Sequence, residues 1–169
     1  SCINIPYYIG PWQYLRKAKQ VKQSARNAVD KKDAVILRVG SNLANCIEPM
    51  LSQQGHPFGL EVVADPYDSF APGSVKHPLR PFFRWFFTRQ LQRQCLKASA
   101  TSYVTQSALQ RRYPAASEAF STYYSDVELS EESFVDLPRS PDHSRSTFTL
   151  IYLGTMAQLY KAPDILLKA

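Results

Sequence analysis

A glycine and a lysine in the last sixteen residues of the sequence have the spacing of a phosphate-binding turn. Gly154 ends an apolar segment typical of a strand, and Lys161 follows seven positions later, where the sequence favours the start of a helix. Strand–turn–helix units present backbone N–H groups and a cation to a phosphate. An ordinary strand–helix unit with a solvated lysine has the same pattern, so this segment alone leaves both interpretations open.

Charged side chains lie at the ends of two further apolar segments. Arg38 is near the end of the first, beside Ser41, while Glu61 and Asp65 bracket the second. Parallel sheets bind ligands at the carboxyl ends of their strands. A charge inside an apolar strand is costly unless it is paired or exposed. We therefore expect Arg38 either to contact an acceptor substrate or a phosphate, or to make an edge contact or an ion pair with an acid such as Glu61. Asp65 precedes a proline and is either a site residue or a simple turn initiator.

The segment 80–97 combines cations with bulky apolar side chains at helical spacing. Its cations, unaccompanied by any acid, are Arg80, Arg84, Arg89, Arg93 and Lys97. A basic helix with aromatic residues can lie on an anionic membrane surface. The alternative is a core helix whose aromatic side chains face a sheet. Trp85 distinguishes the two, because its exposure together with Phe82 favours membrane contact.

Apolar runs and turn residues predict alternating strands and helices. We expect strands at 34–39, 58–64, 100–104, 121–129 and 148–153, helices at 13–29, 43–54, 80–98 and 106–113, and a loop over 65–81. Ser41 and Thr105 are suited to cap the helices that follow them. Pro49 predicts a kink or break in the second helix. Strands separated by such helices predict an α/β, Rossmann-like fold with a parallel sheet and right-handed crossovers.

The apolar strand at 148–153, the Gly154 turn, Lys161 and the following Pro-Asp-x-Leu-Leu-x-Ala resemble one known family. They are similar to the opening of the donor-binding domain in family 4 (group 1) glycosyltransferases with the GT-B fold. The segments 33–41, 60–68 and 100–114 resemble the later half of that family's acceptor-binding domain. The resemblance implies an internal fragment. Residues 1–136 would form an incomplete acceptor-binding Rossmann-like domain, 137–147 a linker, and 148–169 the start of a nucleotide-sugar-binding domain.

The resemblance also implies an activity. The family moves a sugar from a nucleotide-sugar donor to a hydroxyl of a glycan or lipid-linked acceptor, with retention and without metal or cofactor, in polysaccharide or glycoconjugate synthesis. By this resemblance Gly154, Thr155 and Lys161 bind the donor diphosphate, Arg38 and Ser41 contact the acceptor, and Asp65 and Glu61 are catalytic. Thr155 stands where the family often has a second cation, and no histidine lies in the motif around Asp65. The 169 residues alone are expected to show no turnover.

Composition excludes several other classes. The 169 residues and 44% apolar content suit one core, and the net charge of +6 permits anionic partners without selecting one. The sequence lacks metal-ligand spacing, a P-loop, GxGxxG and a nucleic-acid-binding pattern, so we expect no metal and no nucleic acid.

An odd number of cysteines without CxxC predicts reduced thiols in a cytosolic protein. The start resembles neither a signal peptide nor a membrane span. We therefore expect a cytoplasmic location, with peripheral contact at the inner face of the membrane through 80–97.

Two functions outside catalysis remain open from the sequence. The chain could be a non-catalytic α/β binding module that docks on an anionic membrane or a protein partner through the basic aromatic helix. It could also bind a phosphorylated ligand through Lys161 without chemistry.

Overall fold

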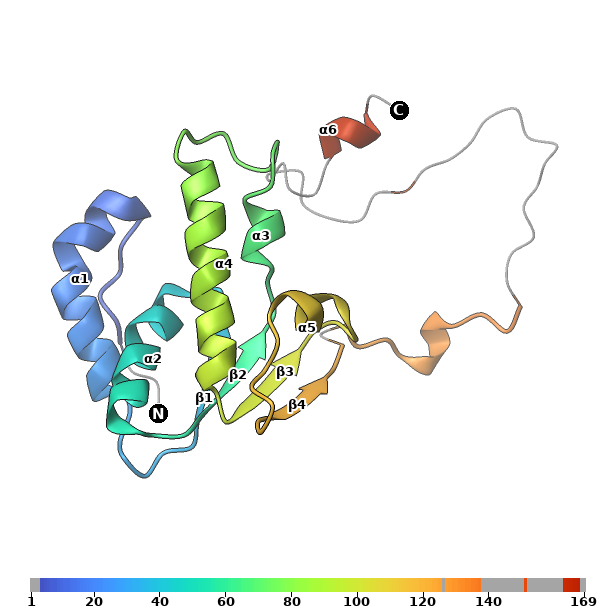
Figure 1. Cartoon of the computed structure of the whole chain (residues 1–169). Coiled ribbons are helices and arrows are strands. Elements are labelled where there is room, and N and C mark those ends of the chain that lie inside the picture. The colour runs from blue at the N-terminus through green and yellow to red at the C-terminus, as the bar shows by residue number, and fades with distance from the viewer. Residues whose placement is uncertain (1–3, 126, 138–150, 152–162, 168–169) are drawn as a thin grey trace.

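The structure is a computed structural model that describes residues 4–125, 127–137, 151 and 163–167 (Figure 1). Its helices are α1 (Gly10–Asn27), α2 (Asn42–Gln54), α3 (Pro66–Ser69), α4 (Arg80–Lys97), α5 (Ala108–Arg112), the 3₁₀ turn η1 (Glu131–Ser133) and α6 (Pro163–Leu166). Its strands are β1 (Val35–Val39), β2 (Phe58–Val62), β3 (Ala100–Tyr103) and β4 (Phe120–Tyr123). Helices and strands alternate along most of the chain, as the apolar runs predict.

The four strands form one parallel sheet in the order β1-β2-β3-β4. Val35 of β1 pairs with Phe58 of β2, and Gly59 of β2 pairs with Ala100 of β3. This arrangement confirms the predicted α/β class with a parallel, Rossmann-like sheet. Since each strand is followed in space by the next one in the sequence, right-handed crossovers place the connecting helices on a single face of the sheet.

Side chains on the helix-covered face form the core. The buried residues in β1, β2 and β3 alternate along each strand, as the two-residue period of a strand requires. They pack with buried side chains of α2, α4 and α5. The largest fully buried side chains are Tyr103, Tyr113, Leu51, Leu60, Val21, Val39, Val62, Thr101 and Cys95. The core therefore lies between the sheet and the layer of helices.

The helices themselves form a continuous layer. In Figure 1, α4 lies between α2 and α3, and α1 lies outside α2. Two side-chain contacts join α2 to α4: Gln94 Nε2 donates to Asn45 Oδ1 at 3.1 Å, and Lys97 Nζ pairs with Glu48 Oε1 at 3.1 Å. The contacts fix the position of α4 across the sheet, and α3 packs against α4 in turn.

The opposite face of the sheet is open in the part of the chain that the structure describes. One cross-strand row runs through Ile36, Gly59, Ala100 and Phe120. Ile36 is 73% exposed and Phe120 is 68% exposed. Parallel sheets are ordinarily covered on both faces. This sheet thus leaves an apolar row, with small residues in its centre, that no described element covers.

Local signals for the helix ends are largely confirmed. Ser41 Oγ accepts a hydrogen bond from Ala44 N at 3.2 Å, and Gly55 ends α2 with φ of +63°. Thr105 Oγ1 accepts from Leu109 N at 3.0 Å, so it caps the short helix α5 although the helix begins only at Ala108. Each bond satisfies an N–H that the first helical turn leaves free.

Three expectations about the elements were wrong in detail, and one of the two outcomes expected at Pro49 did not occur. Pro49 does not break α2, which continues to Gln54 with the proline on its exposed side. The predicted loop 65–81 contains α3, because Asp65 caps it and Pro66 is favourable at a helix start. The strand predicted at 121–129 is only β4, which ends at Tyr123, and β2 ends at Val62 rather than at residue 64.

The expected linker and the strand of the second domain fall mainly outside the described residues. Only Ile151 is described among residues 148–153, and α6 is the described part of the helix expected near the end. The proposed boundaries at 136, 147 and 148 therefore stay predictions.

Candidate functional site

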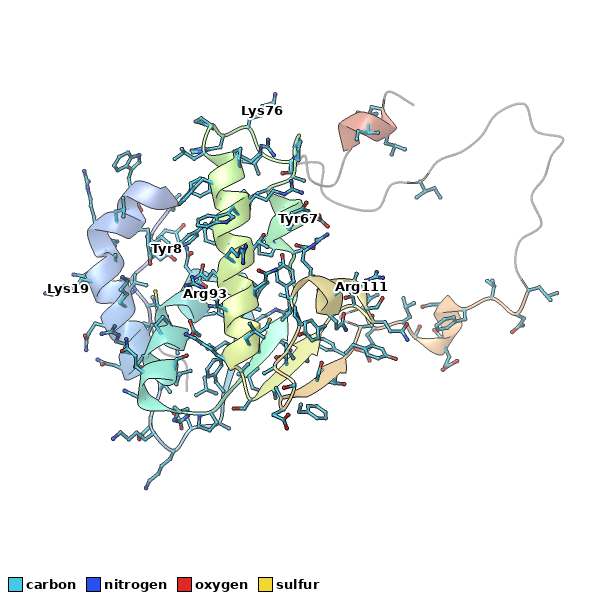
Figure 2. The ribbon with its side chains drawn as sticks, viewed as in Figure 1. Tyr8, Lys19, Tyr67, Lys76, Arg93 and Arg111 are labelled. Carbon is cyan, nitrogen blue, oxygen red and sulfur yellow. The ribbon has the colours of Figure 1, made fainter. Side chains whose placement is uncertain are left out.

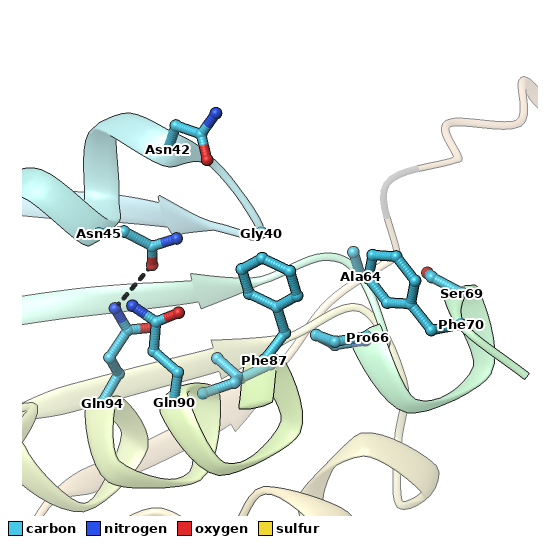
Figure 3. Close-up of a pocket in the computed structure, with 11 residues that line it drawn as sticks. Gly40, Asn42, Asn45, Ala64, Pro66, Ser69, Phe70, Phe87, Gln90 and Gln94 are labelled. Carbon is cyan, nitrogen blue, oxygen red and sulfur yellow. Dashed lines mark hydrogen bonds between the residues drawn. The ribbon is translucent and has the colours of Figure 1, made fainter. Parts of the chain in front are cut away.

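A pocket of about 220 Å³ lies where β1 and β2 end, under α2, α3 and α4 (Figure 3). Parallel sheets collect their ligand sites at this edge. The pocket is lined by Gly40, Asn42, Asn45, Ala64, Pro66, Ser69, Phe70, Phe87, Gln90, Leu91 and Gln94. No charged side chain belongs to this lining, as far as the structure describes the chain. The pocket therefore suits a small, uncharged ligand.

Amide side chains form one wall of the pocket. Asn45 and Gln94 are joined by the 3.1 Å hydrogen bond that Figure 3 shows as a dashed line, and Gln94 is 3% exposed. Gln90 lies one turn earlier on α4 and is half-buried. Each amide carries two donor hydrogens and an acceptor oxygen, so a single mutual bond leaves donors and acceptors for a ligand. Asn42 also donates to the Tyr8 hydroxyl at 3.3 Å, which ties this edge to the segment before α1.

Aromatic and aliphatic side chains form the other wall. The rings of Phe70 and Phe87 stack with centroids 5.6 Å apart, and the lining also includes the buried side chain of Leu91. Gly40 shapes the rim: its φ is +96°, and a Cβ there would lie 3.4 Å from the Cβ of Ala64. Positive φ is strained for residues with a side chain, so glycine is favoured at this turn. Amide side chains therefore line one side of the pocket, and apolar side chains line the other.

Asp65 lies beside this pocket but is fully engaged by protein groups. Its carboxylate pairs with the guanidinium of Arg112, accepts a 2.6 Å hydrogen bond from the Tyr113 hydroxyl, and accepts one from Tyr67 N at 2.9 Å. Asp68 shares the same guanidinium at 3.3 Å. These contacts connect the end of β2 with α3 and α5. The carboxylate predicted to be catalytic therefore has a clear structural role here.

The electrostatics of this cluster favour charge on Arg112 and the neutral form of Tyr113. Partial burial works against the charge of Arg112, but the carboxylates of Asp65 and Asp68 outweigh it and raise its pKa. Burial raises the pKa of Tyr113, and the hydrogen bond to Asp65 adds to the rise. The Tyr113 hydroxyl therefore stays a donor to Asp65 at neutral pH.

Arg38 and Glu61 lie on the open face of the sheet, away from the pocket. They pair with each other at 3.5 Å across neighbouring strands, which is one of the two interpretations that the sequence left open. Glu61 and Asp65 are thus not brought together in one constellation. Ser41 lies at the edge, where its hydroxyl caps α2 and donates to Arg38 O at 3.1 Å. The roles predicted for these residues in acceptor binding and catalysis stay predictions.

Helix α4 has two distinct sides. Leu91 and Cys95 are buried in the core, and Phe83 and Phe87 pack with Phe70. The other aromatic side chains face outward: Phe82 is 51% exposed, Trp85 is 59% exposed and Phe86 is 38% exposed, with the rings in mutual contact. The helix is therefore part of the core and also carries an exposed aromatic patch (Phe82, Trp85 and Phe86).

The predicted diphosphate site lies outside the described residues, because Gly154, Thr155 and Lys161 are not among them. Cys46 and Cys95 are free and buried. Burial raises the pKa of the Cys95 thiol to about 12, which makes it unreactive at neutral pH. Within the described ranges, no group of histidine, cysteine or acidic side chains has the arrangement of a metal site. Likewise, none of the helices in those ranges combines the length and apolar character needed to cross a membrane.

Sequence reasoning missed the amide wall and the partners of Asp65. A signal for the wall existed, since Asn42 and Asn45 are three positions apart on one helix, and Gln90 and Gln94 are four apart on another. That two such amide pairs meet depends on how the helices pack. Arg112 lies within the segment predicted as the helix 106–113, yet its carboxylate partner lies 47 residues away.

Comparison with models of protein families, with curated proteins and with solved structures finds no match for this chain.

Proposed function

We propose that this chain forms the acceptor-binding part of a glycosyltransferase that moves a sugar from a nucleotide-sugar donor to a hydroxyl of a glycan or lipid-linked acceptor. The observation that carries the proposal is the neutral pocket at the carboxyl edge of β1 and β2. The segments that resemble family 4 glycosyltransferases include the ends of these two strands. The proposed place of action is the cytoplasm, at the inner face of a membrane.

The chemistry of the pocket suits a sugar ring. Sugar hydroxyls both donate and accept hydrogen bonds, and the amides of Asn45 and Gln90 offer both functions. The C–H face of a sugar is apolar and would pack on Phe70 or Phe87. The pocket volume of about 220 Å³ is below the range typical of drug-sized ligands, which suits one small ring better than a nucleotide.

The ion pairs limit what the predicted catalytic carboxylates contribute in this arrangement. Asp65 is held by Arg112 and Tyr113, and Glu61 is held by Arg38. Under the proposal, Asp65 positions α3, which brings Pro66 and Ser69 to the pocket. Leaving-group stabilisation is assigned to Gly154, Thr155 and Lys161, where a cation and backbone donors would face the donor diphosphate.

The test is sugar binding to the pocket in solution. Titration with free hexoses, including glucose, galactose, mannose and N-acetylglucosamine, should shift the amide resonances of Asn45, Ser69 and Phe87 in NMR spectra. Gln90→Leu removes two donors and one acceptor from the wall and should weaken the strongest-binding sugar by roughly tenfold. Gln53→Leu, at an exposed position on α2, is the matched control and should bind as the unmodified chain does. Shifts that appear equally in both variants, or no shift with any sugar, would contradict the proposal.

A second candidate function, a binding module that docks on an anionic membrane, is favoured by the exposed aromatic patch on α4. Trp85 and Phe82 are exposed together, which is the condition that the sequence set for membrane contact. Cations flank the patch along the same helix, so apolar insertion and attraction to acidic lipids could act together. This function requires no chemistry and is compatible with a transferase that acts on a lipid-linked acceptor.

Vesicle sedimentation tests the second candidate. The chain should co-sediment with vesicles that contain phosphatidylserine, and Trp85→Ala should weaken the association several-fold, since aromatic burial contributes to interfacial binding. Phe120→Ala is the control because Phe120 is also an exposed aromatic residue, at 68%, but lies on β4. An equal loss in both variants would indicate general hydrophobic adhesion rather than docking through α4.

A further inference from the structure

A second hollow, outside the amide pocket, lies between α3 and α4 and is lined by arginines. Its volume is about 520 Å³, within the range of ligand sites. We call it the arginine groove; it is lined by Tyr67, Pro72, Arg80, Pro81, Arg84, Trp85, Thr88, Arg89 and Gln92. Among the described residues, its lining contains three guanidinium groups and no acid. Such a surface suits an anion, unlike the neutral pocket at the strand ends.

Two of the arginines are held in fixed positions. The guanidinium carbon of Arg84 lies 3.5 Å from the ring centroid of Tyr67, and its Nε donates to Tyr67 O at 2.8 Å. Arg80 Nη1 donates to Phe70 O at 3.0 Å. Each bond uses one of the five N–H donors of a guanidinium, so several donors remain. The side chains are already ordered, which lowers the entropy cost of binding a ligand.

In the part of the chain that the structure describes, no acid forms an ion pair with the arginines of the groove. Among the described residues, the ion pairs of Asp65 and Asp68 are with Arg112, and none joins an acid to Arg80, Arg84 or Arg89. Placing three like charges along one wall is unfavourable without an anion between them. The planar guanidinium fork matches the paired oxygens of a phosphate and binds them bidentately.

We infer that the arginine groove binds a phosphate ester or diphosphate, held by Arg80, Arg84 and Arg89. Trp85 belongs both to the groove and to the exposed aromatic patch on α4. A phosphate in the groove is therefore adjacent to a surface suited to a hydrocarbon chain, which favours a lipid-borne phosphate over a soluble one. This inference goes beyond the sugar-transfer proposal, since its residues do not line the amide pocket, and it makes the second candidate function more specific by naming the lipid group that α4 would hold.

The experiment uses two probes, inorganic pyrophosphate and phosphatidylcholine vesicles that contain phosphatidic acid. Arg89→Gln is the main variant, because Arg89 is exposed and its loss should not disturb the fold. The variant should weaken binding by roughly tenfold, since a hydrogen-bonded charge is lost. Arg84→Lys should also weaken it, because lysine keeps the charge but loses the fork and the stacking on Tyr67.

Arg93→Gln is the matched control. Arg93 is also an exposed residue of α4 and carries the same charge, but it does not line the groove. Figure 2 shows Arg93 nearer than Tyr67 to the end of α4 that meets the sheet. It should change binding by less than about twofold, because a cation outside the lining makes no charge-assisted hydrogen bond to the phosphate and adds only a weak attraction through water. Equal weakening by Arg93→Gln and Arg89→Gln would overturn the inference, as would no binding of either probe.

The two probes also identify the source of the phosphate. Weakening by Arg89→Gln in both arms, with pyrophosphate displacing the chain from the vesicles, supports a lipid-borne phosphate in the groove. Weakening with pyrophosphate alone supports the groove as a site for a soluble phosphate compound. Either result is independent of sugar binding to the amide pocket, so failure here leaves the hexose titration unaffected.

Discussion

At the scale of single residues, Asp65 joins parts of the chain that are distant in sequence. Its carboxylate forms an ion pair with Arg112 at the end of α5 and accepts a hydrogen bond from the hydroxyl of Tyr113, the next residue. It also caps α3 by accepting a hydrogen bond from Tyr67 N. The side chains of Asp65 and Arg112 are 18% and 34% exposed, so solvent only partly screens the pair. A partly buried acid with three partners stabilises the fold more than a surface ion pair does.

Asp65→Asn should lower the free energy of unfolding by about 1–2 kcal/mol, because the charge is lost while the cap can remain. Urea denaturation followed by circular dichroism measures the change. Asp68→Asn is the matched control: it removes the other carboxylate of Arg112, but the Asp68 side chain is 66% exposed. Its effect should be within about 0.5 kcal/mol. Equal effects of the two variants would show that Asp65 has no special structural role.

At the scale of elements, α2 tolerates a proline that its sequence pattern argues against. Pro49 lies on the exposed side of the helix, while its neighbours Glu48 and Leu51 are buried. The proline lacks an N–H, so the carbonyl of Asn45 loses its usual helical partner. Packing of Ala44, Cys46 and Leu51 against the core holds the helix together across the missing bond.

Pro49→Ala should therefore raise the free energy of unfolding by about 1–3 kcal/mol, since it restores the hydrogen bond and the helical preference. Thermal and urea denaturation measure the gain. Gln53→Ala, an exposed change in the same helix, should alter stability by less than about 0.5 kcal/mol. A loss of stability in Pro49→Ala would mean that the proline shapes α2 to fit the sheet.

At the scale of the whole molecule, the core contains phenols and a thiol that favour their protonated forms. Burial raises the pKa values of Tyr103 and Tyr113, and it raises that of Cys95 to about 12. In an unfolded chain these groups ionise at about pH 10 for tyrosine and at about pH 8.5 for cysteine. Because the pKa values are higher in the folded state, the protonated groups favour folding. This contribution to the free energy of unfolding is complete below about pH 8 and is lost as the pH rises toward about 12.

Tyr103→Phe should make that alkaline loss of stability less steep. The variant removes one of the titrating groups and also the 2.7 Å hydrogen bond from the Tyr103 hydroxyl to Tyr113 O, so stability at pH 7 should fall by about 1–2 kcal/mol. Urea denaturation at a series of pH values up to about 11 measures both effects. Tyr123→Phe, at a side chain that is 55% exposed, should change neither. An unchanged pH dependence in Tyr103→Phe would contradict the assignment.

The amino-acid sequence alone determined the α/β class and most of the elements. The apolar run of β1, the cap at Ser41 and the left-handed Gly55 are signals that act over a few residues, and such signals are visible without a structure. The alternation of strands and helices then predicted the parallel sheet. The tyrosines that fill the core, Tyr103 and Tyr113, carry no comparable local signal.

Only the tertiary structure decided which side chains meet. Asn45 and Gln94 are 49 residues apart and form one wall of a pocket, and Asp65 finds its partner 47 residues away in Arg112. Glu61 and Asp65 are four positions apart but do not form one site. Glu61 faces the open side of the sheet, whereas Asp65 follows the end of β2 and caps α3. Local preferences fix φ, ψ and the period of each element, whereas distant pairs depend on how the helices pack over the sheet, which no short stretch of sequence encodes.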